Sequence, residues 1–209
     1  MGYKVLVLGN TSVGKSSAIE NLPENETFVV QCTKKDLPFA GSRKKYVEKE
    51  NKFQTSKPEQ IIKILKAKNE DENIKYIVID DANYIMFYEA KRKRVETGFK
   101  KFVDLAYDFT DILETIDTLR DDLTVFITAH IEKNDFGDES FKTIGKMLRD
   151  QLCIEGLFDI VLLARGVDND YKFVTNGESV AKSPKGMFTE HLIDNDYKKI
   201  ASTVQDYYG

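Results

Sequence analysis

The sequence has little cysteine, little proline and no long apolar stretch, and each shortage excludes a class of protein. Its two cysteines, Cys32 and Cys153, both lie in apolar surroundings. We expect them to be small core residues in a reducing compartment, which excludes a disulfide framework or a cysteine metal site. No apolar run approaches the length of a membrane span, and the N-terminus lacks a signal-peptide pattern. We therefore expect a cytoplasmic protein with no membrane partner.

The chain also lacks an excess of positive charge, internal repeats and low-complexity tracts. The net charge of -4 argues against a uniformly basic coat for nucleic acid, although a local basic face stays open. The basic run at residues 91–94 is either a solvated face or such a contact. A length of 209 residues suits one α/β domain, and we expect residues 1–209 to form a single domain.

The most informative segment covers residues 3–19. An apolar run at residues 5–8 is followed at once by the spacing Gly-x-x-x-x-Gly-Lys-Ser over residues 9–16, and then by a stretch that favours a helix. A strand, a glycine loop and a helix in this order are typical of the phosphate-binding loop of nucleotide-binding proteins. The sequence therefore predicts a nucleoside triphosphate site.

Each residue type in this loop has a physical role. Gly9 and Gly14 allow a tight turn in which consecutive N–H groups point inward at an anion, at the start of the expected helix. Lys15 supplies positive charge to the β- and γ-phosphates, and the Ser16 hydroxyl is a ligand for Mg²⁺. The expected phosphate-binding residues are Gly9, Asn10, Thr11, Ser12, Val13, Gly14, Lys15, Ser16 and Ser17.

Two further strands are predicted to bring polar side chains to the same edge of a parallel sheet. The first covers residues 74–81 and ends in Asp80, which is placed to hold Mg²⁺ together with Ser16, and Asp81, which can orient or activate water. The second covers residues 123–130 and ends in Thr128 and His130, a polar pair that is a candidate sensor of the γ-phosphate. Both strands are apolar, as central parallel strands are.

The remaining pattern predicts an α/β fold of the P-loop NTPase type, a mostly parallel sheet flanked by helices. Further strands are expected at 27–32 and 159–164, and helices from 58, over 143–152, over 194–208 and, as one or two helices, over 84–119. We also expect an irregular or partly β segment at 33–58, a mobile loop at 131–142, and a C-terminal β-hairpin between 171–175 and 179–181 around Asn176-Gly177.

Two other classes of phosphate-loop protein stay open. The loop would suit a GTPase, but the base-selecting spelling at residues 33–36 precedes the Asp80 strand, and Asp80 is not followed by the Asp-x-x-Gly switch. A nucleoside or metabolite kinase would need an arginine-rich lid, and the arginines are few and scattered.

Across nearly its whole length the sequence resembles the phage-type AAA/RecA-like nucleotide-binding proteins, a group that includes single-strand-annealing recombination ATPases. The segments that carry the resemblance are 9–17, 76–81, 128–130, 143–146, 158–161 and 181–188. The resemblance implies a RecA-like strand order, ATP and Mg²⁺ as ligands, action on single-stranded DNA, and a homo-oligomeric ring or filament in the cytoplasm of a host cell.

The resemblance also assigns roles to individual positions. A basic residue from a neighbouring subunit would stabilise the transferring charge, and Lys182 or Lys185 is the candidate. The loop after His130 is expected to contact DNA through Lys133, Phe136 and Lys142. The acidic residues Asp135, Asp138 and Glu139 lie in the same loop and oppose tight DNA binding. The catalytic glutamate that RecA relatives carry after their second strand is missing; the strand ends in Gln31-Cys32-Thr33 and the nearest carboxylate is Asp36.

The expected mechanism is in-line attack of water on the γ-phosphate, with Lys15, Asp80, Asp81, His130 and Lys182 as the catalytic set. The alternative is a nucleotide-gated interaction or assembly protein that binds ATP and turns it over slowly.

Overall fold

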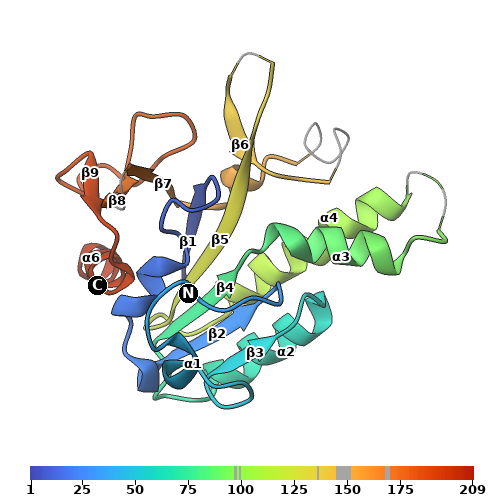
Figure 1. The fold of residues 1–209 in the computed structure, drawn as a ribbon, viewed down its shortest axis with the longest axis horizontal. Helices are drawn as coiled ribbons and strands as arrows, with labels where there is room; N and C mark the ends of the chain where they lie inside the picture. Colours follow the sequence, from blue (N-terminus) through green and yellow to red (C-terminus); the bar gives the residue numbers. More distant parts are fainter. Residues whose placement is uncertain (97, 99, 136, 145–151, 168–169) are drawn as a thin grey trace.

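The computed structural model describes residues 1–209 except 97, 99, 136, 145–151 and 168–169. The described strands form one nine-stranded sheet in the order β3-β2-β4-β5-β1-β7-β8-β9, with β6 paired to β5 (Figure 1). The strands are β1 (Tyr3–Gly9), β2 (Thr27–Gln31), β3 (Lys52–Gln54), β4 (Tyr76–Asp80), β5 (Thr124–Lys133), β6 (Glu139–Phe141), β7 (Ile160–Val167), β8 (Asp170–Val174) and β9 (Leu192–Asp194). The described helices are α1 (Ser42–Lys45), α2 (Pro58–Asn69), α3 (Asn83–Arg92), α4 (Lys100–Asp117) and α6 (Tyr197–Tyr208), with 3₁₀ segments η1 (Ser17–Asn21), η2 (Glu24–Glu26) and η3 (Ile154–Leu157).

The central strands are parallel, and β5 lies between β1 and β4. Strands β1, β4 and β5 therefore end at one edge of the sheet, where Gly9 pairs with His130 and Ile79 pairs with Ile127. Strand β5, which carries His130 and continues past the expected end at residue 130 to Lys133, thus separates the phosphate-loop strand from the Asp80 strand. The predicted α/β fold with a mostly parallel sheet and flanking helices is confirmed.

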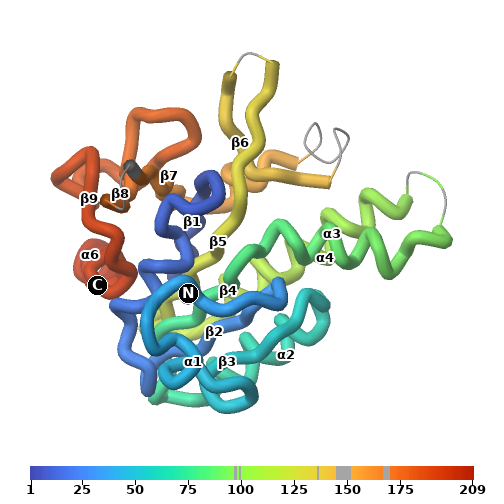
Figure 2. The backbone as a smooth tube through the Cα atoms, viewed as in Figure 1, coloured from blue at the N-terminus to red at the C-terminus, as the bar shows by residue number. Residues whose placement is uncertain are grey.

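Alternating side chains of the central strands fill two separate cores. Leu6 and Leu8 pack in the core that α2, α3 and α4 close on one face, while Val5 and Val7 pack on the other face with η1 and α6. Figures 1 and 2 show α2, α3 and α4 on one side of the sheet and α6 on the other. Burial on both faces explains why these strands are continuous apolar runs rather than alternating ones.

The C-terminal antiparallel part has different strands from those expected. Strand β8 pairs antiparallel with β7 and with β9, so the predicted pairing of residues 171–175 with 179–181 is wrong. Lys182 instead forms an isolated antiparallel bridge with Val161 of β7. The C-terminal helix begins at Tyr197 rather than at residue 194, because Asp196 caps its first turn by accepting from the backbone N–H groups of Lys198 and Lys199.

The segment predicted as a mobile loop at 131–142 contains a β-hairpin. Strand β6 pairs antiparallel with β5, and Ile131 lies opposite Phe141. Both side chains are buried, and the Phe141 ring contacts Phe109 of α4 at a centroid distance of 5.5 Å. Ile131 and Phe141 anchor the hairpin to the core. The polar residues between them make this segment look like a loop in the sequence.

Three further features of the structure bear on the cysteines, on the helix expected over 143–152 and on membrane-spanning helices. Cys32 is buried as expected, whereas Cys153 is exposed, so its expected place in the core is wrong. The helix expected over 143–152 lies mostly outside the described residues. Over the described ranges, no helix combines the length and apolar character that crossing a membrane requires.

Candidate functional site

The phosphate loop begins at Gly9, the last residue of β1, and packs against β7 and β8. A Cβ on Gly9 would lie 2.8 Å from Val13 Cγ2 and 2.9 Å from the Ala164 carbonyl oxygen. Gly14 has φ +88°, and a Cβ there would lie 2.6 Å from Tyr171 Cγ. Both glycines are therefore required by space, and Gly14 also by its backbone conformation.

The helix expected after the loop is short. Residues 17–21 form the five-residue 3₁₀ segment η1, so only a weak helix dipole is available to an anion. The C-terminal segment supports the loop instead. The Tyr197 hydroxyl donates to the Lys15 carbonyl oxygen at 2.6 Å, and Asn195 Nδ2 donates to the Gly14 carbonyl oxygen at 3.1 Å. This support comes from residues more than 180 positions away.

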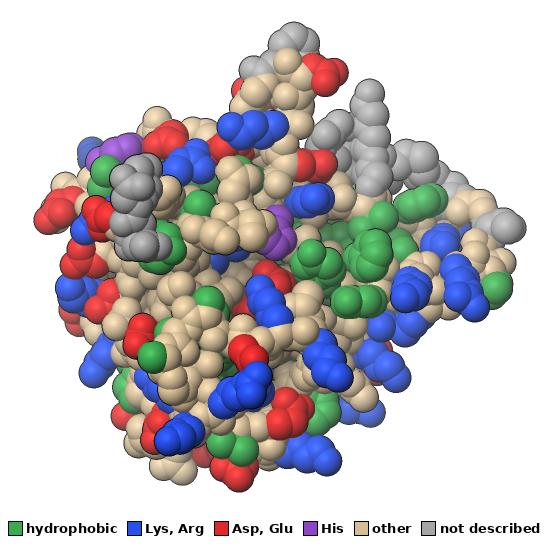
Figure 3. Space-filling model, in the orientation of Figure 1, with side chains coloured by type: hydrophobic (Ala, Val, Ile, Leu, Met, Phe, Trp, Pro, Cys, Tyr) green, Lys and Arg blue, Asp and Glu red, His purple; other side chains and the backbone are tan. Residues whose placement is uncertain are grey.

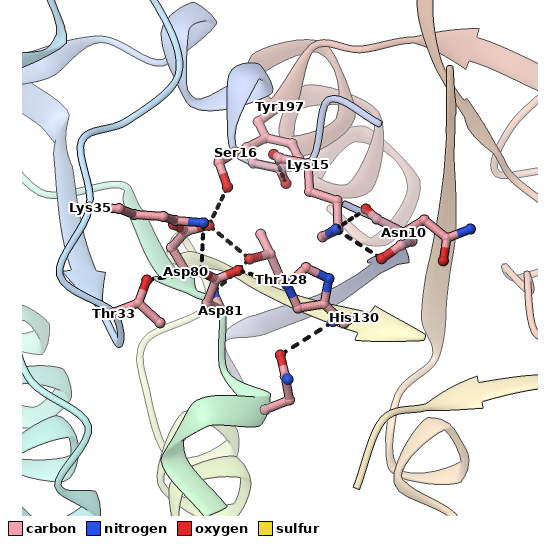
Figure 4. A network of polar contacts seen from close by, with 12 residues as sticks. Asn10, Lys15, Ser16, Thr33, Lys35, Asp80, Asp81, Thr128, His130 and Tyr197 are labelled. Atoms are coloured by element: carbon pink, nitrogen blue, oxygen red, sulfur yellow. Dashed lines mark hydrogen bonds and ion pairs between the residues drawn. The ribbon is translucent and has the colours of Figure 1, made fainter. Parts of the chain in front are cut away.

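Lys15 is almost completely buried in the loop that it serves. Its Nζ donates to the carbonyl oxygens of Gly9 at 2.8 Å and Asn10 at 2.5 Å. Burial lowers the pKa of Lys15 to about 8, against the opposing effect of the Asp81 and Asp80 charges. Figure 4 shows the ammonium turned to these carbonyl groups rather than to the carboxylates.

The predicted metal-binding pair is brought together. Ser16 Oγ donates to Asp80 Oδ1 at 2.6 Å, and the fully buried Thr128 hydroxyl donates to the same oxygen at 2.9 Å. The other oxygen, Asp80 Oδ2, is buried without a hydrogen bond among the described residues. Burial, followed by the Asp81 charge, raises the pKa of Asp80. A buried carboxylate oxygen without a hydrogen bond, beside a serine hydroxyl, fits Mg²⁺, which prefers oxygen ligands.

Within the described ranges, no group of three or more His, Cys, Asp or Glu side chains could hold a metal. Mg²⁺ is commonly held by one or two carboxylates together with water and substrate phosphates. Ser16 and Asp80 would hold the ion in that way.

Asp81 has a strained backbone and several polar neighbours. Its φ is +61°, a conformation that is uncommon outside glycine and is often found at functional sites. Its N–H donates to Thr128 Oγ1 at 2.9 Å, while its Oδ2 accepts from the Thr33 hydroxyl at 2.9 Å. Lys35 Nζ lies 2.6 Å from Oδ2, and His130 Nε2 lies 3.6 Å from Oδ1 (Figure 4). Asp81 is thus held in one orientation, from both sides.

A pocket of about 450 Å³ is lined by the phosphate loop and by Asp81. Its wall contains most of the predicted phosphate-binding residues and two of the predicted catalytic residues outside the loop. The lining residues are Thr11, Ser12, Val13, Gly14, Lys15, Ser16, Ser17, Lys35, Pro38, Asp81, His130 and Tyr171. Loop backbone, a buried ammonium and a carboxylate in one pocket suit a polyphosphate with a reacting end.

His130 occupies the wall between Asp81 and α3. Burial lowers the pKa of His130, and the nearby Lys15 charge lowers it further, so the imidazole is neutral at physiological pH. Its backbone N–H donates to Asn83 Oδ1 at 3.3 Å, and its ring meets the Tyr84 ring edge-on with centroids 6.2 Å apart. Thr128, its expected partner as a phosphate sensor, points at Asp80 and does not line the pocket.

Lys182 lies away from this pocket. Its backbone pairs with Val161, near the start of β7, whereas the pocket lies at the opposite ends of the parallel strands. Its predicted role, which needs a neighbouring subunit, stays a prediction.

The sequence reasoning missed Lys35, Thr33, Tyr171 and Tyr197. In the sequence, residues 33–36 match the base-selecting spelling of a GTPase, and Asp36 is the carboxylate nearest to the missing glutamate. In the structure Asp36 is exposed and pairs with Arg43 at 2.6 Å, away from the pocket. The signal was available: β2 pairs with β4 through Gln31 and Asp80, so the residues after β2 must lie beside the carboxylates.

The low pKa of Lys15 predicts how nucleotide affinity depends on pH. A bound polyphosphate stabilises the charged ammonium, so binding above pH 8 requires proton uptake. We expect the Kd for Mg·ATP to be flat between pH 7 and 7.5 and to rise above pH 8, approaching about tenfold per pH unit. A fluorescent-nucleotide titration from pH 7 to 9.5 measures this. A flat profile to pH 9.5 would contradict the burial of Lys15.

Comparison with known proteins agrees with this geometry. A search of curated proteins gave no match to the chain. The sequence model described as an AAA domain matches residues 1–186, which include the phosphate loop, both carboxylates and His130. Taken with the strand order and the phosphate loop facing Asp80, this match places the chain in the AAA-domain family of P-loop ATPases.

Proposed function

We propose that this chain binds Mg·ATP in the pocket and hydrolyses it, and that hydrolysis is coupled to single-stranded DNA. The observation that carries the nucleotide part is the buried Asp80 oxygen without a hydrogen bond, on the carboxylate that the Ser16 hydroxyl of the phosphate loop contacts. Without a metal that oxygen stays desolvated, with the Lys35 ammonium at 3.9 Å and no hydrogen bond, which is costly.

The residues divide the chemistry between them. Loop N–H groups and Lys15 bind the phosphates, and Ser16 with Asp80 would hold Mg²⁺, which neutralises charge on the phosphate oxygens. Asp81 orients the attacking water and accepts its proton, because it is the carboxylate that lines the described pocket. His130, in contact with Asp81, forms the wall beside the water.

A surface on α3 supports single-stranded DNA as the partner. Tyr84, Phe87 and Tyr88 contact one another through their rings, and Phe87 is 51% exposed. Figure 3 shows hydrophobic side chains gathered over α3 beside a histidine, with Lys and Arg side chains around the far end of the helix. Exposed aromatic rings bordered by positive charge suit base stacking with phosphate neutralisation. The Tyr84–His130 contact joins this surface to the nucleotide pocket.

The basic residues of α3 and of the turn after it differ in whether they form ion pairs within the protein. Arg92 pairs with Glu89, and Lys93 pairs with Asp108 at 2.7 Å. Lys91 and Arg94 are exposed and form no ion pair with a described residue, so they are the phosphate contacts we propose. The loop after His130 is a weaker candidate. Its Lys133 pairs with Glu139 at 3.3 Å, and Phe136 lies outside the described residues.

A homo-oligomer completes the proposal. The pocket provides Lys15 and Lys35 as its lysines but no arginine among the described lining residues. A basic residue from a neighbouring subunit, Lys182 or Lys185, would supply transition-state charge as an arginine finger does. The phage-type recombination role belongs to this proposal and follows from the resemblance of the sequence.

One observation favours a second function, nucleotide-gated assembly with little turnover. The ion pair of 2.6 Å between Lys35 and Asp81 occupies the carboxylate that would activate water. If this pair persists with ATP bound, the protein binds ATP as a clamp and hydrolyses it slowly.

The test is the rate of ATP hydrolysis in Mg²⁺ with and without single-stranded DNA, with light scattering in the same samples. We expect the rate and the particle size to rise together when DNA is added. Tight ATP binding with a flat, slow rate would favour the assembly protein. Hydrolysis of GTP alone, or consumption of ATP that needs a small acceptor, would contradict the proposal in favour of a GTPase or a kinase.

The α3 surface makes a separate prediction. Replacing Phe87 and Tyr88 with alanine should weaken binding of an oligo-dT probe at least about tenfold, since each stacked base contributes roughly 1–3 kcal/mol. Basal ATP hydrolysis should be unchanged. Tyr107→Ala is the matched control, because Tyr107 is an aromatic residue on α4 that is 63% exposed. Fluorescence anisotropy measures both variants, and equal affinities would remove α3 from the proposal.

A further inference from the structure

Lys35 lies in the turn after β2 and lines the pocket. Its Nζ lies 2.6 Å from Asp81 Oδ2 and 3.9 Å from Asp80 Oδ2, the oxygen that has no hydrogen bond. In Figure 4 it points at both carboxylates from the side opposite to Lys15. The side chain is 43% exposed, whereas the two carboxylates are almost completely buried.

The charge of the pocket shows what Lys35 does in the absence of nucleotide. Two adjacent buried carboxylates repel each other, and each needs a nearby positive charge to remain ionised. Lys15 does not supply it directly, because its ammonium donates to the carbonyl oxygens of Gly9 and Asn10. Among the described residues, Lys35 is the basic side chain within ion-pair distance of Asp80.

This arrangement conflicts with a bound metal ion. A magnesium ion held by Ser16 and Asp80 would place a double positive charge next to the Lys35 ammonium. The two cations repel, and the exposed, flexible lysine is the one that can move. The neighbouring wall of the same pocket is the phosphate loop, which needs positive charge when a triphosphate is bound.

We propose that Lys35 exchanges partners: it pairs with Asp80 and Asp81 in the nucleotide-free protein, and it contacts the terminal phosphate when Mg·ATP is bound. The exchange leaves Asp81 available to water only when a γ-phosphate is present. Asp81 is therefore available with ATP bound and not with ADP bound. This inference rests on the proposed binding of Mg·ATP but is independent of DNA and of turnover.

The first test uses the melting temperature of the nucleotide-free protein with and without Mg²⁺. Lys35→Met removes the positive charge that pairs with Asp80 and Asp81. In buffer without divalent ions, we therefore expect its melting temperature to be roughly 3–8 °C below that of the original protein. Millimolar Mg²⁺ should restore much of the loss in Lys35→Met and leave the original protein unchanged. Lys34→Met is the control, because Lys34 is the exposed neighbour and should melt as the original protein does in both buffers.

The second test compares Mg·ATP with Mg·ADP by equilibrium binding. Lys35→Met should weaken ATP about tenfold and leave ADP within about twofold, because a charge-assisted hydrogen bond to the γ-phosphate is lost. Lys35→Arg retains the charge and should recover most of the ATP preference, and it serves where Lys35→Met does not fold. An unchanged ATP-to-ADP ratio together with no Mg²⁺ effect on melting would overturn the inference. Loss of the DNA response alone would leave it standing.

Discussion

Replacing Lys15 with alanine is expected to abolish useful nucleotide binding, with an increase of roughly a hundredfold in the Kd for Mg·ATP. The lysine is 5% exposed, and its ammonium lies between the loop carbonyls and the pocket. Its neighbours hold it in place before nucleotide arrives, so its charge is available to the phosphates without a rearrangement of the backbone.

The substitution should not unfold the protein. Burial depresses the pKa of Lys15, which means that the folded state already disfavours its charged form. We therefore expect the melting temperature of Lys15→Ala to equal or exceed that of the original protein. Calorimetric titration with ATP, together with a thermal melt, measures both effects. Lys34→Ala is the control, because it removes the same positive charge at an exposed position. An unchanged affinity for ATP would contradict the site assignment.

Replacing Asp81 with asparagine is expected to reduce kcat for ATP hydrolysis by roughly a hundredfold to ten thousandfold, with a Kd for ATP within a few-fold of the original. Asparagine has the same shape and can still accept from Thr33, but it cannot accept a proton from water. The loss should therefore appear in the chemical step and not in binding.

The control for Asp81 is Asp36→Asn. Asp36 is an exposed carboxylate in the segment after β2 and pairs with Arg43 outside the pocket. Its loss should leave kcat within about twofold. Single-turnover hydrolysis of Mg·ATP measures both variants. Full activity of Asp81→Asn, or a large loss for Asp36→Asn, would move the water-activating role elsewhere.

The phosphate loop and Asp80 were predictable from sequence because local patterns determine them. An apolar run fixes a buried strand, and the residue at its end must lie at the carboxyl edge of the sheet. The meeting of Ser16 and Asp80 at 2.6 Å follows from that rule, although 64 residues separate them.

Lys35 and Tyr197 were missed for a different physical reason. Each reaches the site from a segment whose position depends on the whole fold: the turn after β2 for Lys35, and helix α6 for Tyr197. No periodicity marks such residues. The β5–β6 hairpin was missed because its two buried anchors, Ile131 and Phe141, are separated by a polar stretch that resembles a loop.

Equilibrium binding of ATP with Mg²⁺ and with EDTA tests whether Ser16, Asp80 and Lys15 form a magnesium–nucleotide site. We expect saturable binding at one site per chain in Mg²⁺, at least about tenfold weaker in EDTA, and a loss of this Mg²⁺ dependence in Asp80→Asn, whose side chain is a poorer metal ligand. Binding that is equally tight in EDTA, or no binding of ATP or GTP in either buffer, would show that these residues do not form such a site.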